Sequence, residues 1–207
     1  MPSIYQLKPA FQNLLRPLVR GLARAGVTPN QVTLAAFALS LIVGAAIAWR
    51  PGNHALLLLV PLVMFVRMAL NAVDGMLARE HDMRSVLGGF LNELTDVLAD
   101  CALYLPFALV LPAYGWLVVA VVLAAIIGEY AGVIGQALGG TRRYDGPMGK
   151  SDRAFVFGLL ALLLGVGLAP GLLCGILLLF TLLLAAWTVV NRVRRAVAEI
   201  AEAKKIQ

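Results

Sequence analysis

The chain has 207 residues, of which 61% are hydrophobic and only 14% are charged. One water-soluble core cannot bury that much apolar surface, so the composition excludes an ordinary soluble domain and indicates a protein inserted in a membrane. The formal net charge of +6 does not indicate a nucleic-acid partner, because the basic residues lie at the ends of apolar runs and form no RNA- or DNA-binding motif; anionic membrane lipids are the simpler partner.

The first segment, residues 3–25, is predicted to be an amphipathic helix. Its apolar side chains recur at helical spacing, and basic or amide side chains form a row four residues apart on the other face. Such a helix typically lies in the membrane interface. Gly26 and the turn Thr28-Pro29-Asn30 then end it and begin the next helix. Two roles stay open, a membrane anchor alone or an anchor that also shapes the rim of a site.

Six apolar runs follow, most of them near the length of about 20 residues that a helix needs to cross a membrane. They lie at residues 31–50, 54–78, 87–110, 113–138, 154–169 and 171–190. No repeat or long linker divides them. We therefore predict an all-α integral membrane protein, a single domain over residues 1–207. It has an interfacial helix, a bundle of six transmembrane helices over residues 31–190 and a cytoplasmic tail over residues 191–207.

Lysine and arginine residues are concentrated in alternate connections. They precede the first run, separate the second from the third and the fourth from the fifth, and follow the sixth, whereas the opposite connections contain only Arg50. Connections rich in basic residues stay in the cytoplasm. Both termini are therefore predicted to be cytoplasmic.

The second and third runs contain the main candidates for chemistry, because a polar or charged side chain inside a membrane helix needs a partner or a function. On each run the candidates are three or four residues apart, so they share a helical face: Asn71, Asp74 and Ala78 on the second, and Asn92, Asp96 and Asp100 on the third.

Matching the depth of these side chains predicts how the two antiparallel helices pair. Asp74 and Asn92 belong at the cytoplasmic ends, and Asn71 and Asp96 about one turn deeper. Arg67 and Asp100 come a further turn down, so the matched depth predicts an ion pair between them beneath the site.

Hard oxygen ligands of this kind suit Mg²⁺ or Mn²⁺, which bind phosphates through a few carboxylates. Gly75 leaves its backbone uncovered for the close approach of a phosphate or metal. Arg79, one turn after Gly75, can bind a phosphate through its planar guanidinium. The active site is therefore expected on the cytoplasmic side.

These residues resemble the signature of the CDP-alcohol phosphotransferase family. The signature reads Asp, two residues, Asp-Gly, two residues, Ala-Arg, about eight residues, Gly, three residues, Asp, three residues, Asp. The chain matches this spacing from Asn71 to Asp96, and the resemblance extends to the amphipathic start and the six runs. It implies a transferase of phospholipid synthesis that moves a phosphatidyl group from CDP-diacylglycerol, or a related CDP-lipid, to a small alcohol, with or without a phosphate, and releases CMP.

The resemblance also implies a role for each matching residue. Asp96 is the expected general base that takes the proton of the acceptor hydroxyl. One or two Mg²⁺ or Mn²⁺ ions are expected on Asn71, Asp74, Asn92 and Asp96. The CDP moiety is expected to contact Asn71, Asp74, Gly75, Ala78, Arg79 and Gly88.

The chain departs from the signature at its first and third aspartates, which are here Asn71 and Asn92. An amide oxygen can bind a metal ion but brings no charge, so a second ion should bind more weakly. Glu93 is one auxiliary carboxylate, and Asp100 is another if it is not tied to Arg67. The chain resembles a bacterial subgroup of the family with the same two asparagines, which implies the bacterial inner membrane.

A second polar cluster lies in the connection before the fifth run. Lys150, Arg153 and Arg142 either bind the phosphate of an anionic acceptor or belong to a cytoplasmic loop in which Ser151 or Asp152 caps the fifth helix.

Glu129, in the fourth run, is deep enough to need a partner, and both a structural ion pair and a contact with the acceptor stay open. A homodimer also stays open as the assembly.

Three other functions compete with the transferase. An intramembrane prenyltransferase would need two Asp-rich motifs on separate helices, and a transporter would favour inverted symmetry between the halves. The sequence instead concentrates its charges on the second and third runs. The remaining alternative is a catalytically altered or silent CDP-lipid-binding protein, because two of the four signature carboxylates are amides.

Overall fold

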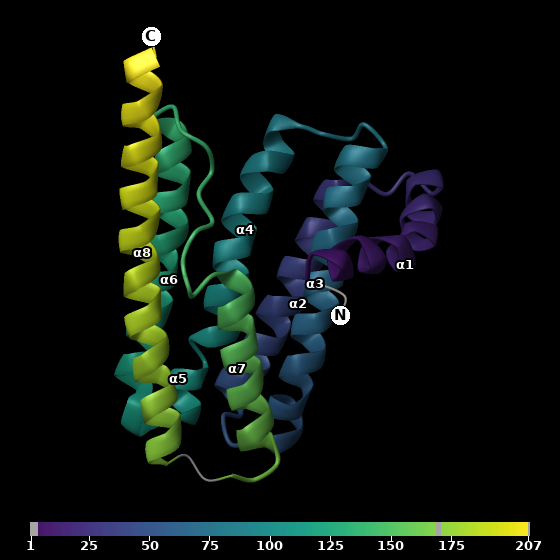
Figure 1. The fold of residues 1–207 in the computed structure, drawn as a ribbon. Helices are drawn as coiled ribbons and strands as arrows, with labels where there is room; N and C mark the ends of the chain where they lie inside the picture. Colours follow the sequence, from purple (N-terminus) through teal and green to yellow (C-terminus); the bar gives the residue numbers. More distant parts are fainter. Residues whose placement is uncertain (1–3, 169–170, 207) are drawn as a thin grey trace. The chain divides into compact units, whose positions relative to one another are not determined.

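The computed structural model describes residues 4–168 and 171–206, with the side chains of residues 9–168 and 171–203, and all regular structure in these ranges is helical (Figure 1). Four positions of the predicted segments lie outside the described residues. They are residue 3 of the interfacial helix, residue 169 of the fifth run, residue 170 before the sixth run, and residue 207 of the tail. The elements are α1 Ile4–Arg24, α2 Pro29–Trp49, α3 His54–Glu80, α4 Val86–Tyr104, α5 Phe107–Val110, a 3₁₀ turn Pro112–Tyr114, α6 Gly115–Ala137, α7 Lys150–Gly165 and α8 Leu172–Ile206. The prediction of an all-α protein is confirmed.

Four of the described helices are long and apolar enough to cross a membrane: α2, α3, α6 together with its preceding turn, and α8. The two other helices of the predicted bundle, α4 and α7, are not among these four. The 19 residues of α4 include Glu93, Asp96 and Asp100. The 16 residues of α7 span only about 24 Å, less than the hydrocarbon thickness of about 30 Å.

The third predicted run is not one continuous helix. We expected it to extend to residue 110, but α4 ends at Tyr104 and a separate short helix begins at Phe107. Pro106 lies between the two helices, and a proline has no backbone N–H to donate and disfavours helical geometry in the residue before it.

α7 begins earlier than the predicted fifth run, and α8 ends later than the predicted sixth run. α7 begins at Lys150 because Asp152 caps it, its carboxylate accepting a hydrogen bond of 2.8 Å from the backbone N–H of Gly149. α8 continues through most of the predicted tail. Two of its side chains in that region, Arg192 and Ala196, are buried. The predicted tail is therefore helical for most of its length, and it packs on the unit through these two residues.

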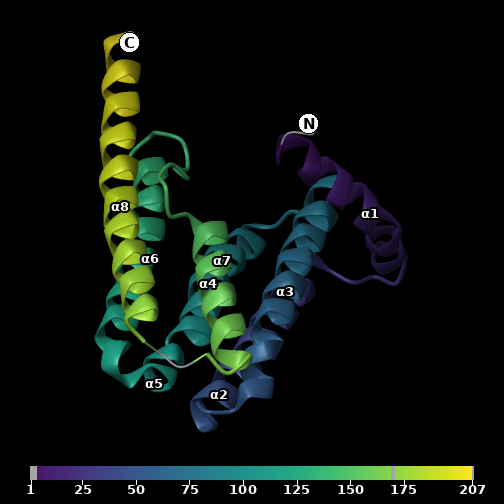
Figure 2. The same cartoon turned by 60° about the horizontal axis from the view of Figure 1, so that its bottom comes forward.

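Contacts within the chain form two compact units, Met1–Val43 with Leu62–Ala102, and Gly44–Pro61 with Leu103–Gln207. The core of the first unit joins Val19 of α1 to Val32 of α2 and to Val73, Met76 and Leu77 of α3. α1 lies across the end of α3 (Figure 2). These contacts hold α1 against the last turns of α3.

One edge of α1 is joined to α3 by a salt bridge of 3.2 Å between Arg16 and Glu80. Its outer face is apolar and unburied within the unit, since Leu14 is 75% and Leu18 53% exposed. α1 thus has one apolar face that packs on protein and a second that does not.

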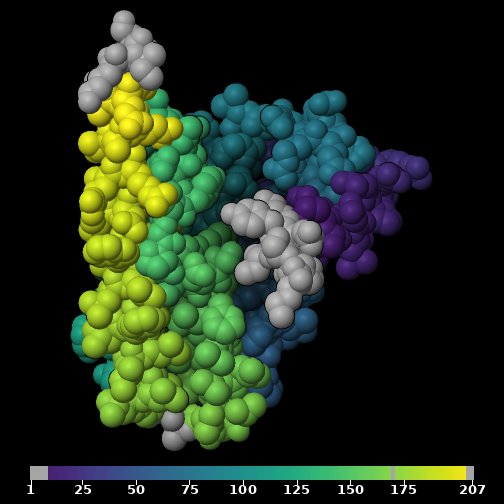
Figure 3. All heavy atoms as spheres, in the orientation of Figure 1, coloured from purple at the N-terminus to yellow at the C-terminus, as the bar shows by residue number. Residues whose placement is uncertain are grey.

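In the second unit, α6 and α8 run side by side (Figures 1 and 2). Small residues on α6 permit the close approach: a Cβ on Gly135 would lie 3.0 Å from the Cβ of Ala196. Tyr104 and Phe157 add a stacked ring pair with centroids 4.2 Å apart. α8 is exposed along much of its length in Figure 3, and its exposed apolar side chains include Ile176, Phe180, Leu183 and Trp187.

Candidate active site

A cavity of about 300 Å³ lies in the first unit, between the start of α2, the end of α3 and the start of α4. Its lining includes six of the residues that the sequence predicted for the site, namely Asp74, Gly75, Ala78, Arg79, Gly88 and Asn92. The remaining lining residues are Pro29, Asn30, Thr33, Met83, Arg84, Ser85 and Gly89. The structure therefore brings most of the predicted CDP-binding residues to one hollow.

Asp74 is the buried carboxylate of this cavity, with only 5% of its surface exposed. The hydroxyl of Thr33, on the neighbouring helix α2, donates a hydrogen bond of 2.8 Å to Asp74 Oδ2. Thr33 is itself buried, and its oxygen lies 3.1 Å from the carbonyl oxygen of Pro29. Thr33, near the start of α2, thus helps to orient the Asp74 carboxylate.

Below the cavity, α3 and α4 pair in the register that the depth argument predicted. Asn71 Nδ2 donates to Asp96 Oδ1 at 3.0 Å. One turn further along, Arg67 Nη1 and Asp100 Oδ1 are 2.6 Å apart and both side chains are buried. The predicted ion pair between Arg67 and Asp100 is confirmed.

Four of the predicted metal-binding, catalytic and auxiliary residues do not line the cavity: Asn71, Asp96, Glu93 and Asp100. Asp100 is held by Arg67, so the condition for its auxiliary metal role is not met. Arg67 also donates to the backbone oxygen of Asp96 at 3.0 Å, and its Nη2 lies 3.7 Å from Asp96 Oδ1. Asp96 is therefore fixed by two residues of α3.

Two glycines let polar groups approach each other at the cavity wall. A Cβ on Gly75 would lie 2.9 Å from Arg79 Nη2. A Cβ on Gly88 would lie 2.8 Å from Asn30 Oδ1 and 2.9 Å from Ser85 Oγ. A larger residue at position 75 would displace the guanidinium of Arg79, and one at position 88 would displace the side chains of Asn30 and Ser85.

The start of α4 gives the cavity an environment suited to phosphate. Ser85 caps the helix, its hydroxyl oxygen accepting a hydrogen bond of 2.9 Å from the N–H of Gly88. The positive end of a helix favours an anion, and Arg79 and Arg84 add two guanidinium groups to the lining.

The donor atoms also fit a hard divalent ion. Asp74, with a carboxylate, and Asn92, with an amide, both line the cavity. Mg²⁺ and similar ions commonly bind one or two carboxylates and complete their coordination with substrate phosphates and water. Among the described residues no group of three or more His, Cys, Asp or Glu residues could hold a metal ion, so the phosphates of a ligand would have to supply part of the coordination.

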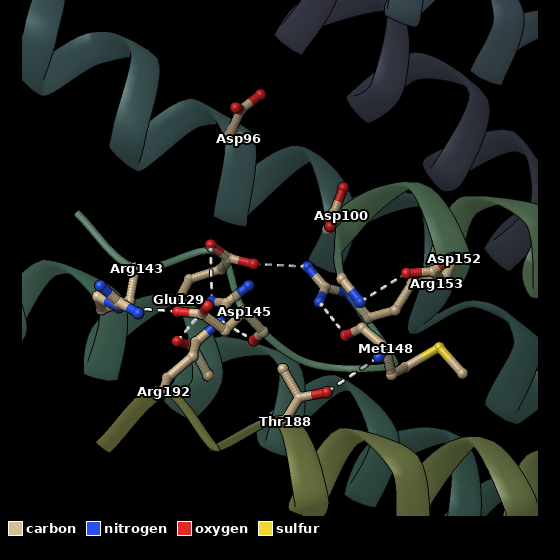
Figure 4. Close-up of polar contacts among 12 residues, drawn as sticks. Asp96, Asp100, Glu129, Arg143, Asp145, Met148, Asp152, Arg153, Thr188 and Arg192 are labelled. Atoms are coloured by element: carbon tan, nitrogen blue, oxygen red, sulfur yellow. Dashed lines mark hydrogen bonds and ion pairs between the residues drawn. The ribbon is translucent and has the colours of Figure 1, made fainter. Parts of the chain in front are cut away.

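The second unit contains a buried charge cluster around Glu129 of α6 (Figure 4). Its carboxylate is 3.1 Å from Arg142, 3.0 Å from Arg153 and 3.3 Å from Arg192. Arg153 is 2% and Arg192 1% exposed. The ion-pair interpretation of Glu129 is confirmed, and two of the basic residues predicted to bind an acceptor are its partners. Lys150, the third, is half-buried in the first turn of α7.

Asp145 fixes the connection between α6 and α7. Its two oxygens are each 2.7 Å from an arginine, Arg143 in the same connection and Arg195 on α8. Burial raises the pKa of Asp145, but the hydrogen bond from Arg143 and the positive charges of Arg143 and Arg195 outweigh it and hold the pKa below its ordinary value.

Sequence reasoning missed several residues at these two places. Thr33 gave one signal, a hydroxyl about one turn after the Pro29 that begins a mostly apolar helix. Arg192 was assigned to the tail, although no glycine or proline follows residue 175 and the helix had no reason to end at residue 190. Asn30, Arg84 and Ser85 gave no signal of their own, because only the folded connection places them at the cavity.

Comparison with solved structures shows the same fold in two crystal structures of the phosphatidylinositol phosphate synthase PgsA1 of Mycobacterium tuberculosis. One has CDP-DAG bound, and the likeness has a TM-score of 0.74 at 19% sequence identity, covering 87% of this chain and 92% of that chain. The other is a complex with manganese and citrate, also with a TM-score of 0.74 at 19% identity, covering 87% of each chain.

Comparison with sequences finds close relatives as well. The inner membrane protein YnbA of Escherichia coli is 45% identical over 202 residues, which are 97% of this chain and 99% of that protein. The archaetidylinositol phosphate synthase of Pyrococcus horikoshii is 32% identical over 104 residues, which are 50% of this chain and 53% of that protein. The model of the CDP-alcohol phosphatidyltransferase family matches residues 26–191. The chain belongs to the CDP-alcohol phosphatidyltransferase family.

Proposed function

We propose that the protein is an integral membrane transferase of phospholipid synthesis. It moves a phosphatidyl group from CDP-diacylglycerol, or a related CDP-lipid, to a small alcohol and releases CMP. The observation that carries this proposal is the cavity in which six residues of the family signature meet. Membership of the family and the shared fold with a CDP-DAG-bound structure support the same donor.

The cavity binds the CDP head group in this proposal. Arg79 and the N-terminus of α4 meet the phosphates, and Gly75, Ala78 and Gly88 leave room for the nucleotide to lie against backbone. Asp74, held by Thr33, faces the diphosphate. A bare carboxylate would repel that anion, so the pairing requires a cation between them.

A Mg²⁺ or Mn²⁺ ion satisfies that requirement, with Asp74, Asn92, Asn71 and Asp96 as its proposed ligands. When bound, the ion would neutralise charge on the diphosphate and on the departing CMP. The family membership supports a divalent metal, as does the shared fold with a PgsA1 structure that contains manganese.

Asp96 acts as the general base. It takes the proton of the acceptor hydroxyl as that oxygen forms a bond to the phosphorus of the phosphatidyl group and the bond from this phosphorus to CMP breaks. The contacts of Asp96 with Asn71 and Arg67 support this role, because they fix a carboxylate one turn from the cavity residue Asn92.

Lys150, Arg153 and Arg142 contact the acceptor in this proposal. Arg142 and Arg153 lie together with Arg192 around the carboxylate of Glu129, and Lys150 lies in the first turn of α7. This group of basic side chains supports an anionic acceptor, such as a phosphorylated alcohol.

The membrane arrangement is part of the proposal. Six helices, α2, α3, α4, α6, α7 and α8, cross the bacterial inner membrane, α1 lies on its cytoplasmic face, and both termini and the site are cytoplasmic. The similarity to an inner membrane protein and the apolar helices support this location. The family model spans both compact units, which supports a single functional domain over residues 1–207. Assembly as a homodimer is a further expectation, and light scattering of the solubilised protein would test it.

The alternative function is a CDP-lipid-binding protein with altered or no catalysis. The observation that favours it is the pair of amides, Asn71 and Asn92, at two positions where the family signature has carboxylates. Both functions use the same cavity and the same site residues, so only an activity measurement separates them.

The test incubates the purified protein with CDP-diacylglycerol, Mg²⁺ or Mn²⁺ and a panel of acceptors, and follows release of CMP. The panel contains glycerol phosphate, inositol phosphate, inositol, serine and choline. We expect CMP release with at least one acceptor, and its loss in Asp96→Asn. Asp82→Asn is the matched control, because Asp82 is exposed and has a positive φ of 53°, a conformation that asparagine tolerates well.

The outcomes separate the functions. CDP binding without CMP release from any acceptor would favour the silent binding protein. Absence of both CDP binding and CMP release would reject the transferase.

A further inference from the structure

Asn71 contacts Asp96 directly, through its amide nitrogen. Nδ2 lies 3.0 Å from Asp96 Oδ1. An ionised carboxylate only accepts hydrogen bonds, so the amide must turn its N–H toward Asp96 and its carbonyl oxygen away. With an aspartate at position 71 the two carboxylates would repel each other at this distance unless a cation lay between them. The asparagine replaces that repulsion with a hydrogen bond.

The amide contact opposes a bridging ion at the same oxygen. An N–H group cannot bind a metal ion, so an ion shared by Asn71 and Asp96 Oδ1 would require the amide to turn over and lose its hydrogen bond. Arg67 adds positive charge on this side, with Nη2 at 3.7 Å from the same oxygen. This guanidinium is also paired with Asp100, and at this distance it competes with a divalent cation for the carboxylate of Asp96.

Asp74 is in a different environment. Its carboxylate lies in the lining of the cavity, together with Asn92. The hydroxyl of Thr33 donates to its Oδ2 and helps to orient the carboxylate in that lining. Metal affinity is therefore expected at Asp74 and disfavoured at the pair formed by Asn71 and Asp96.

We infer that the protein binds a single divalent ion, on Asp74, and that Asn71 is a positioning residue that holds the carboxylate of Asp96. This inference rests on the proposed function; it narrows the one or two proposed ions to one and removes Asn71 and Asp96 from the proposed metal ligands. The hydrogen bond from Asn71 keeps the carboxylate of Asp96 in position, so no cation is needed between residues 71 and 96.

The test counts bound Mn²⁺ per chain by equilibrium dialysis of the detergent-solubilised protein in saturating CDP, with electron paramagnetic resonance to measure the free ion. We expect one ion for the wild type. Asn71→Asp should bind a second ion, because it restores a pair of carboxylates that a cation can bridge. Asn13→Asp is the matched control: Asn13 is exposed on α1 and its oxygen already accepts from Arg16 at 2.7 Å, so the added charge should leave the count at one.

A second variant tests the positioning role without adding charge. Asn71→Ala should lower kcat for CMP release at least tenfold and leave the CDP-dependent rise in melting temperature unchanged, since Asn71 does not line the cavity. A loss of CDP stabilisation in Asn71→Ala would overturn that role and indicate a ligand contact instead.

Two ions on the wild type, or an unchanged count in a folded Asn71→Asp protein, would overturn the inference and leave the proposed function standing. Binding of no ion by the wild type, together with no CDP stabilisation, would reject both.

Discussion

The hydroxyl of Thr33 is the smallest feature on which the site depends. Its hydrogen bond to Asp74 joins two buried groups of different helices. A hydrogen bond to a charged group contributes about 1.5–3 kcal/mol. Thr33→Val keeps the shape and removes the hydroxyl, so we expect the CDP affinity to fall by about tenfold or more. Isothermal titration with CDP in the presence of Mn²⁺ measures this.

Thr33→Ser is the matched variant, because it retains the hydroxyl and loses only a methyl group. It should bind CDP almost as well as the wild type. Equal affinities for the valine and serine variants would show that the hydroxyl does not orient Asp74.

The buried pair of Arg67 and Asp100 is expected to stabilise the folded protein and not to contact the ligand. Removing one partner leaves an unpaired charge in a buried place, which costs about 3–5 kcal/mol. We expect Asp100→Asn to lower the melting temperature of the solubilised protein strongly, and Arg67→Met combined with Asp100→Leu to recover part of the loss. A single variant as stable as the wild type would contradict this account.

This pair also shows what residue spacing can predict. Arg67, Asn71, Asp96 and Asp100 lie at four-residue steps on antiparallel helices, so matching depths was enough to predict which side chains meet. Spacing alone could not reveal Thr33 or Asn30, since their place at the cavity depends on how α2 packs against α3. Nor could it choose the orientation of the Asn71 amide, which follows from the contact with Asp96.

Among the elements, α6 and its neighbours depend on small residues. A Cβ on Gly132 would overlap the guanidinium of Arg142, which pairs with Glu129. We therefore expect Gly132→Ala to destabilise the protein by about 1–3 kcal/mol through overpacking. Denaturation followed by circular dichroism measures the effect.

The control substitution is Gly21→Ala in α1, where a Cβ would meet no atom within 4 Å. Alanine favours a helix over glycine by roughly 0.5–1 kcal/mol, so this variant should be unchanged or slightly more stable. If Gly132→Ala were as stable as Gly21→Ala, the close packing of Arg142 against Gly132 of α6 would be contradicted.

Helix positions followed from apolar periodicity, but helix ends depended on single residues. Pro106 interrupts the predicted third run, and Asp152 starts α7 earlier than hydropathy suggested. α8 continues past the apolar run because Arg192 and Ala196 pack inside the unit, which a hydropathy pattern cannot register.

At the scale of the whole molecule, the six-span arrangement predicts which side of the membrane each connection faces. α7 is the critical helix, since it has only 16 residues. In a variant without native cysteines, Tyr144→Cys should react with a membrane-impermeant thiol reagent only from the cytoplasmic side, and Leu168→Cys only from the opposite side. Both positions are exposed, at 69% and 54%. Reaction of both from the same side would show that α7 does not cross.

The central claim is that the cavity around Asp74 binds the CDP head group, and thermal unfolding with added CDP and Mn²⁺ tests it most directly. A ligand at 100 times its dissociation constant stabilises the folded state by about 2.7 kcal/mol. We predict a clear rise in melting temperature for the wild type and for the control Asp82→Asn, and no rise for Asp74→Ala. No rise in the wild type, or an equal rise in Asp74→Ala, would contradict the account.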